Sequence, residues 1–265
     1  MAQDGGLPHI GCRRDECVKA RENPALKRHV SSLAIVDAES GQHWVLDATP
    51  DFPAQIAGLP GTLAGVFLTH AHIGHYTGLM FLGREAEGAK GVPVYAMPRM
   101  REFLTNEGPW SQLVSLHNID LRPVEDGVRL NERISVTAIR VPHRDEFSET
   151  VGFIIAGPKR KVLFLPDIDK WEKWDRPVED VIRGVDRAYV DGTFYADGEV
   201  PGRSMSEIPH PFIVESMKRL EPLASKVRFI HLNHTNPALQ KGPELGAIQK
   251  EGFAVAVEGE TFALD

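Results

Sequence analysis

Three histidines lie close together in the segment 69–78, which reads Thr-His-Ala-His-Ile-Gly-His-Tyr-Thr-Gly. This segment directly follows the apolar run Gly-Val-Phe-Leu, a pattern typical of a buried strand. Residues at i and i+2 of an extended segment lie on the same side, so His70 and His72 can bind one metal ion, and His75 can then turn toward a second. Surface or merely hydrogen-bonded histidines are the alternative, but three of the eleven histidines of the chain gather here. The segment therefore predicts a transition-metal site at the end of a strand.

This spacing resembles the His-X-His-X-Asp-His signature of the metallo-β-lactamase superfamily, and Gly78 matches the glycine that usually follows. Gly74 stands where the family has its aspartate. The resemblance implies an α/β fold, the metallo-β-lactamase αββα sandwich, in a single domain over residues 1–265. It also implies one or two divalent metal ions, zinc first, with manganese or iron as alternatives. Without the aspartate, the second ion should bind less tightly or borrow water, substrate or a carboxylate such as Asp169.

Three further residues match the remaining metal ligands of the family, and each follows a predicted strand. His143 comes after a β-branched run and a proline, and it matches the third histidine of the first metal site. Asp167 matches the aspartate that bridges both ions, although a lone aspartate after a strand is more often a turn residue. His231 is the first histidine after a late apolar run and matches the last ligand. The resemblance thus implies one ion on His70, His72 and His143, a second on His75 and His231, and Asp167 between them.

Asp47, Asp191 and His210 are predicted to act beside these ligands. Asp47 ends a strand, where the family has a carboxylate that accepts a hydrogen bond from a ligand histidine; an ordinary turn aspartate is the alternative. His210 precedes an amphipathic helix, where tRNase Z and the cyclic phosphodiesterase have a histidine that contacts the scissile phosphate. The unperturbed pKa of histidine suits protonation of a leaving oxygen, while a plain histidine at a helix N-terminus is the alternative. Asp191 could orient His210, so the implied catalytic residues are His210, Asp167 and Asp191.

The segment 7–17, Leu-Pro-His-Ile-Gly-Cys-Arg-Arg-Asp-Glu-Cys, resembles a Gly-Cys-X-Cys-X-X-Cys segment of two branches of the superfamily. These branches are the cyclic-ribose phosphodiesterases of phosphonate catabolism and the pyrroloquinoline-quinone biosynthesis protein B family. Arg14 replaces the middle cysteine. A structural zinc takes four ligands, so His9 or Asp15 could fill the vacancy, and buried reduced cysteines are the alternative. The resemblance implies that such a zinc would bind Cys12, Cys17 and His234.

Short apolar strands alternate along the chain with helix-like segments, without repeats or low-complexity linkers. The predicted strands cover residues 32–37, 43–47, 65–69, 93–96, 134–141, 152–156, 161–165, 188–191, 227–233, 253–257 and 261–264. The predicted helices cover residues 16–22, 76–84, 100–106, 110–115, 177–183, 211–220 and 243–251. This order fits two packed sheets flanked by helices. The first N-terminal strand of the family is short or missing, and a partner chain could cover the open edge in a homodimer.

Composition narrows the choice of partners. The 265 residues are 42% hydrophobic, which is enough for one large core, and no apolar stretch has the length of a membrane span. A formal net charge of −7 argues against a nucleic-acid enzyme, because binding to a phosphate backbone depends on clustered lysine and arginine. No secretory signal opens the sequence, so we expect a cytoplasmic protein that acts on a small molecule, with no membrane or nucleic-acid partner.

The predicted function is a metal-dependent hydrolase, specifically a phosphodiesterase for a small substrate. Two divalent ions would lower the pKa of a bridging water and neutralise the charge of a phosphodiester. His210 would then protonate the departing alkoxide. The alternative is an iron-dependent oxidoreductase or a protein of pyrroloquinoline-quinone-type cofactor biosynthesis, because the order of motifs resembles that branch most closely. A non-catalytic metal-binding protein is a third reading, supported by Gly74 and the incomplete set of cysteines.

Overall fold

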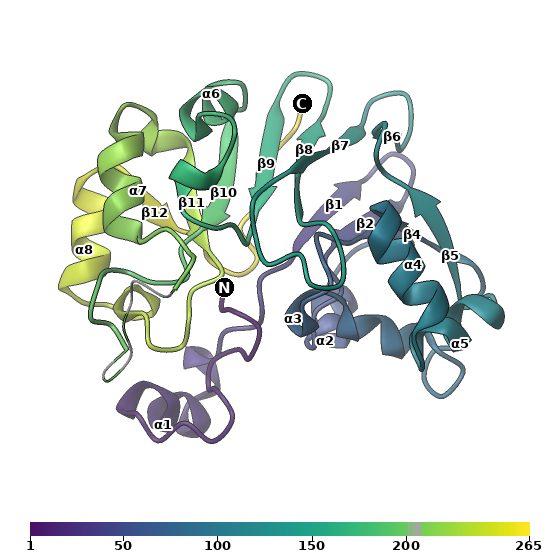
Figure 1. Ribbon diagram of the computed structural model, residues 1–265, viewed down its shortest axis with the longest axis horizontal. Coiled ribbons are helices and arrows are strands. Elements are labelled where there is room, and N and C mark those ends of the chain that lie inside the picture. Colours follow the sequence, from purple (N-terminus) through teal and green to yellow (C-terminus); the bar gives the residue numbers. More distant parts are fainter. Residues whose placement is uncertain (201, 203, 205–207) are drawn as a thin grey trace. The chain divides into compact units, whose positions relative to one another are not determined.

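Two β-sheets organise the computed structural model, which describes residues 1–200, 202, 204 and 208–265 (Figure 1). The contacts within the chain divide it into two compact units. The five-stranded unit contains residues 32–128 and 145–151, and the seven-stranded unit contains residues 1–31, 129–144 and 152–265. The single domain expected from the sequence stays a prediction.

The sheet of the five-stranded unit contains, in spatial order, β1 (Leu33–Asp37), β2 (Gln42–Leu46), β3 (Thr62–Phe67), β4 (Val92–Ala96) and β5 (Ile119–Pro123). Strand β1 is antiparallel to β2, and β2 to β5 run parallel. Since the carboxyl ends of parallel strands meet at one edge of a sheet, the residues that follow β2 and β3 are brought together there. The helical segments of this unit are α2 (Phe52–Ala57), α3 (Ile73–Tyr76), the 3₁₀ segment η2 (Thr77–Leu82), α4 (Pro98–Asn106) and α5 (Trp110–Ser115).

The sheet of the seven-stranded unit contains, in spatial order, β12 (Ala254–Val255), β11 (Val227–Ile230), β10 (Arg187–Asp191), β9 (Lys161–Leu165), β8 (Val151–Ala156), β7 (Ser135–Arg140) and β6 (Val128–Arg129). Strands β9 to β12 are parallel, so the residues after β9, β10 and β11 meet at one edge. Strand β8 is antiparallel to β9. The helices are α1 (Asp15–Glu22), α6 (Val178–Arg183), α7 (Ile213–Leu220) and α8 (Pro243–Lys250), with 3₁₀ segments η1 (Pro24–Leu26), η3 (Trp171–Lys173), η5 (Glu221–Lys226) and η6 (Pro237–Leu239).

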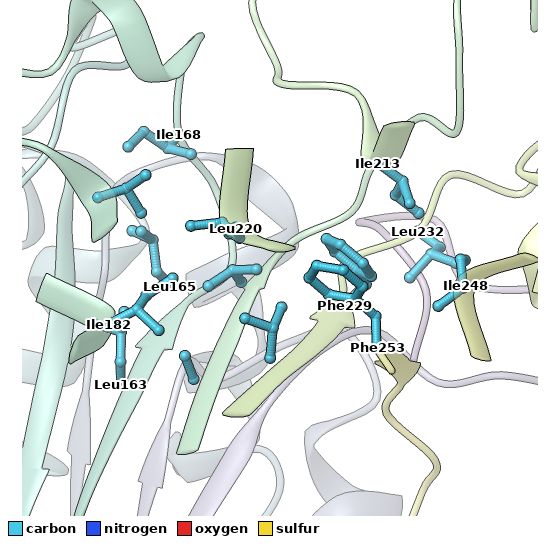
Figure 2. Packing of buried hydrophobic residues seen from close by; sticks show 14 of the residues in the cluster. Leu163, Leu165, Ile168, Ile182, Ile213, Leu220, Phe229, Leu232, Ile248 and Phe253 are labelled. Atoms are coloured by element: carbon cyan, nitrogen blue, oxygen red, sulfur yellow. The ribbon is translucent and has the colours of Figure 1, made fainter. Parts of the chain in front are cut away.

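A hydrophobic core packs between the sheet and the helices of the seven-stranded unit (Figure 2). Leu163 and Leu165 of β9 are fully buried in it, as is Phe229 of β11. The ring of Phe229 stacks on Phe253 with 5.8 Å between ring centroids. Burying such a side chain stabilises the folded state by about 1.5–3 kcal/mol. This packing holds fixed the strands whose ends carry the predicted ligands.

The five-stranded unit has its own core, and Gly78 is essential to its packing. Leu68 and Phe52 are fully buried there. A Cβ atom on Gly78 would lie only 2.2 Å from the carbonyl oxygen of Thr49 and 2.6 Å from Cβ of Phe52. The backbone N–H of Gly78 donates to the carbonyl of Ala48 at 2.8 Å. The glycine therefore lets the turn after the histidine segment approach the end of β2 closely.

Most of the predicted strands form, but three differences have clear causes. Residues 261–264 form no strand; instead the carbonyl of Leu264 accepts hydrogen bonds from the N–H groups of Lys159 and Arg160. Strand β11 ends earlier than predicted, because His231 takes a left-handed conformation with φ of 62°. Strand β5 and helix α2 were not predicted, since their short polar-interrupted sequences carry a weak periodic signal. Within the described part of the chain, every helix is too short or too polar to cross a membrane.

The first residues of the chain form isolated bridges in place of a regular strand, as the sequence predicted. Ala2 makes parallel bridges with both Val30 and Leu232. Its N–H donates to the carbonyl of His29 at 2.8 Å, and the N–H of Gln3 donates to the carbonyl of Leu232 at 2.9 Å. The N-terminal segment is thereby held beside the residues that follow β11.

Candidate metal centre

In the five-stranded unit, the carboxylate of Asp47 holds the side chain of His75. Asp47 directly follows β2 in a left-handed conformation with φ of 66°, and it is fully buried. Nδ1 of His75 lies 2.8 Å from Oδ2 of Asp47. The backbone N–H and hydroxyl of Thr69 donate to the same carboxylate at 2.8 and 2.9 Å. A carboxylate on Nδ1 leaves Nε2 as the nitrogen that can bind a metal, so the contact agrees with the role predicted for Asp47, which stays a prediction.

In each of the other two histidines of the segment, one ring nitrogen also lies within hydrogen-bond distance of an oxygen atom. Nδ1 of His70 lies 3.0 Å from Oγ1 of Thr69, and Nε2 of His72 lies 3.1 Å from Oε2 of Glu146. The ring centroid of His70 lies 4.4 Å from that of His72 and 4.2 Å from that of His75. The structure thus gathers the three predicted ligands of this unit. Sequence reasoning missed Glu146, whose only signal was its place three residues after His143.

In the seven-stranded unit, His143 and Asp167 lie side by side. Nε2 of His143 is 3.2 Å from Oδ2 of Asp167, and its Nδ1 is 3.1 Å from Oδ1 of Asp169. Asp169 also accepts from Nζ of Lys173 at 2.8 Å. Burial opposes the charged form of His143, but the carboxylate of Asp167 outweighs this effect and raises the pKa of the imidazole. Asp169, which the sequence offered as a borrowed ligand of the second ion, therefore orients His143.

His210 lies against two buried carboxylates. Its Nδ1 is 2.8 Å from Oδ2 of Asp191 and 3.2 Å from Oδ1 of Asp167. A bridge between Phe194 and Phe212 brings the segment before α7 to the end of β10, where Asp191 lies. Burial disfavours the imidazolium, but Asp191 and then Asp167 overcome that effect and raise the pKa of His210 to about 9. The geometry joins the three residues that the sequence predicted as catalytic.

His231 follows β11, and an oxygen atom of another side chain lies close to each of its ring nitrogens. Its Nδ1 lies 3.0 Å from Oγ1 of Thr193, which donates to Oδ1 of Asp191 at 2.7 Å. Its Nε2 lies 3.4 Å from Oδ1 of Asp4. The ring is fully buried, and its backbone N–H donates to the hydroxyl of Ser31. Sequence reasoning missed both Thr193 and Asp4.

The spacing between donor atoms fits divalent metal ions. Two ligand atoms that each lie about 2.1 Å from a tetrahedral ion are about 3.4 Å apart. The distance between His143 and Asp167 is 3.2 Å. Imidazole and carboxylate donors suit zinc, manganese and iron. Each unit therefore presents ligands of the predicted kind, and their assignment to particular ions stays a prediction.

The predicted structural zinc site is less complete. Cys12 and Cys17 are free cysteines, and burial, followed by a hydrogen bond with Cys12, raises the pKa of the Cys17 thiol. The ring of His234 stacks on that of His9 with 4.3 Å between centroids. Among the described residues, no cluster of three ligand atoms within 4.8 Å of one another includes Cys12, Cys17 and His234. A zinc at this position stays a prediction.

Comparison with known proteins agrees with the predicted fold. The sequence profile of the beta-lactamase superfamily domain matches residues 43–232. The chain is 26% identical to coenzyme PQQ synthesis protein B of Cupriavidus necator over 306 aligned positions, which cover 99% of this chain and 97% of the relative. It is 28% identical to the protein of the same name from Ectopseudomonas mendocina, with the same coverage.

Two solved structures share the fold. Zn²⁺-bound PqqB from Methylobacterium extorquens has a TM-score of 0.81 at 22% identity, covering 99% of this chain and 97% of that one. A diphosphatase from the PhnP family has a TM-score of 0.68 at 21% identity, covering 98% and 92%. The predicted metallo-β-lactamase fold is thereby confirmed. Since the family profile spans most of the chain, this protein belongs to the beta-lactamase superfamily.

Proposed function

We propose that this protein is a metal-dependent hydrolase that cleaves a small phosphodiester. The observation that carries the proposal is the contact between His210 and Asp191, 2.8 Å long, beside the predicted bridging ligand Asp167. This arrangement provides a proton donor next to a metal ligand. The proposed ligands are His70, His72 and His143 for one ion, His75 and His231 for the other, and Asp167 for both.

When bound, divalent ions would supply an acidified water and neutralise charge on a phosphate. Hydrolysis would form a bond from a water oxygen to phosphorus and break the bond between phosphorus and the leaving oxygen. His210 donates its Nε2 proton to the leaving oxygen, while Asp191 on Nδ1 stabilises the imidazolium before transfer. The carboxylate of Asp191 on Nδ1 favours the protonated form of His210, as a general acid requires.

The charge of the chain favours a small substrate over a nucleic acid. A net charge of −7 disfavours long-range attraction to a phosphate backbone. A protein described as a diphosphatase shares the fold, so the fold is compatible with the proposed chemistry on a phosphate. The proposed setting is the cytoplasm.

A step in the synthesis of a pyrroloquinoline-quinone-type cofactor is the second candidate, including an iron-dependent oxidation. It is favoured by the relatives named coenzyme PQQ synthesis protein B, whose similarity extends over 99% of this chain. Hydrolysis and oxidation require different metals and different co-substrates. Metal content and oxygen uptake therefore discriminate between the two candidates.

The test begins with protein purified anaerobically without added metal. The numbers of zinc, manganese and iron ions bound per chain are measured by elemental analysis. Turnover of bis(p-nitrophenyl) phosphate is then measured for the wild type, and turnover of a cyclic alkyl phosphodiester, whose leaving alkoxide must be protonated, is measured for the wild type and for His210→Ala. We expect zinc or manganese and a loss of turnover of about 100-fold or more in the variant, the usual effect of removing a general acid. His29→Ala, at a half-exposed histidine that pairs with Glu258, is the matched control.

Two results would overturn the hydrolase. One is a chain loaded mainly with iron that consumes oxygen and does not cleave the ester. The other is a His210→Ala variant that retains its zinc or manganese and turns over at the rate of the wild type.

A further inference from the structure

The turn at Asp4 is fixed by backbone pairing on both of its sides. Before the turn, Gln3 donates to the carbonyl of Leu232, and the N–H of Leu232 donates to the carbonyl of Met1. After it, Gly6 donates to the carbonyl of Gln3 at 2.7 Å and has a φ of 66°, a conformation that glycine adopts without strain. These bonds place Asp4 beside His231, although 227 positions separate the two in sequence.

The distance between Asp4 and His231 fits two ligands of one ion better than a hydrogen bond. Oδ1 of Asp4 lies 3.4 Å from Nε2 of His231, beyond the usual range of about 2.7–3.2 Å for a hydrogen bond. Two ligand atoms on one tetrahedral ion lie about 3.4 Å apart. Nδ1 of His231 is already held by Thr193, so Nε2 is the nitrogen that can bind a metal.

The second predicted metal site also needs an anionic ligand. Gly74 stands where the family signature has an aspartate. Asp169 is engaged with His143 and Lys173. The side chain of Asp4 is 41% exposed, so its carboxylate has room to adjust toward an ion.

We propose that Asp4 is a ligand of the second metal ion and supplies the carboxylate that Gly74 does not. This inference rests on the proposed metal centre, and it adds a ligand from the N-terminal turn to His231. The ion retained there is a divalent cation that accepts oxygen and nitrogen donors, such as zinc or manganese.

The experiment measures metal binding directly. Metal-free wild type, Asp4→Ala, Asp4→Asn and the double variant Asp4→Ala/Gly74→Asp are titrated with Zn²⁺, and bound zinc is counted by elemental analysis. The wild type should bind two ions at the predicted centre, and both single variants should bind the second at least about tenfold more weakly, because one anionic ligand is lost. The double variant should regain the affinity for the second ion, since Gly74→Asp places a carboxylate where the family signature has its aspartate.

Gln3→Ala is the matched control, because Gln3 belongs to the same segment and pairs through its backbone. Circular dichroism verifies that each variant is folded, and Asp4→Asn keeps the shape of the side chain while removing its charge. An unchanged affinity for the second ion in Asp4→Asn, or a wild type that binds no second ion, would overturn the proposal.

Ester turnover is measured separately from zinc binding. One result is a protein that cleaves no phosphodiester but whose Asp4 variants still lose the second ion. That result would uphold Asp4 as a ligand and overturn only the proposed substrate. Turnover of the phosphodiester, together with a zinc count that is unchanged in the Asp4 variants, would uphold the substrate and overturn Asp4 as a ligand.

Discussion

The hydroxyl of Thr193 links the imidazole of His231 to the carboxylate of Asp191, with distances of 3.0 and 2.7 Å. The hydroxyl accepts from Nδ1 of His231 and donates to Asp191. In the five-stranded unit, the hydroxyl of Thr69 links Nδ1 of His70 to the carboxylate of Asp47 in the same way. In both units, a threonine after a strand sets the tautomer of a predicted ligand histidine.

Replacing Thr193 by valine keeps the shape of the side chain and removes the hydroxyl. We expect the affinity for zinc to fall about 10–100-fold, the usual effect of losing the partner of a ligand histidine. Competition with a chelating dye measures the dissociation constant. Thr193→Ser retains the hydroxyl and should bind nearly as the wild type does; equal weakening in both variants would show that packing, and not the hydrogen bond, is responsible.

Glu146 should orient His72 from the loop that follows His143. Its carboxylate lies 3.1 Å from Nε2 of His72, and its side chain is 46% exposed. Because exposure weakens the contact, Glu146→Gln should lower zinc affinity by about tenfold, the lower end of the range for such partners. The exposed Glu85 provides the control variant Glu85→Gln, and an equal effect of both substitutions would exclude a specific role for Glu146.

The ion pair between Arg101 and Glu125 predicts part of the dependence of stability on pH. Its two contacts are 2.8 and 2.9 Å long, and this bonding lowers the pKa of Glu125 to about 2. The folded pKa lies below the unfolded value, so the contribution is complete above about pH 4.5 and disappears as the pH falls toward 2. Glu125→Gln should cost about 1 kcal/mol at pH 7, as a partly exposed pair allows.

Urea unfolding at pH 7 and pH 3 checks this expectation, with the wild type and the variant compared at each pH. The gap between their unfolding free energies should narrow at pH 3. A gap that is as large at pH 3 as at pH 7 would assign the loss to packing.

Gly78→Ala should destabilise the five-stranded unit. The added methyl group would meet the carbonyl oxygen of Thr49 at 2.2 Å, and the backbone would have to shift. We expect a loss of about 1–3 kcal/mol, typical of overpacking, measured by thermal unfolding. Gly58 has open space around its Cβ position, so Gly58→Ala should be nearly neutral; comparable losses in the two variants would contradict the steric argument.

The placement of the candidate ligands at strand ends could be predicted from the sequence because its signals are local. His70, Asp167 and His231 each follow an apolar run, and parallel strands bring such residues to one edge of a sheet. The fold was predictable for the same reason, since most strands are β-branched runs bounded by turns.

Residues whose role depends on distant pairing could not be found in this way. Asp4 approaches His231 only because the N-terminal segment pairs beside Leu232, and Glu146 reaches His72 from 74 positions away. No periodicity or spacing encodes such contacts. The prediction of Asp191 beside His210 relied on the family, because the bridge between Phe194 and Phe212 that joins their segments has no sequence signature.

Asp47 and His231 both have a backbone conformation that most residues avoid, with φ of 66° and 62°. Asparagine, aspartate and histidine tolerate this region better than bulky residues do, yet each such residue still costs about 1–3 kcal/mol. Glycine would relax either backbone but would remove the carboxylate or the imidazole. The chain has thus given up thermodynamic stability at the ends of β2 and β11, and a metal ion bound there would return part of it as folding stability.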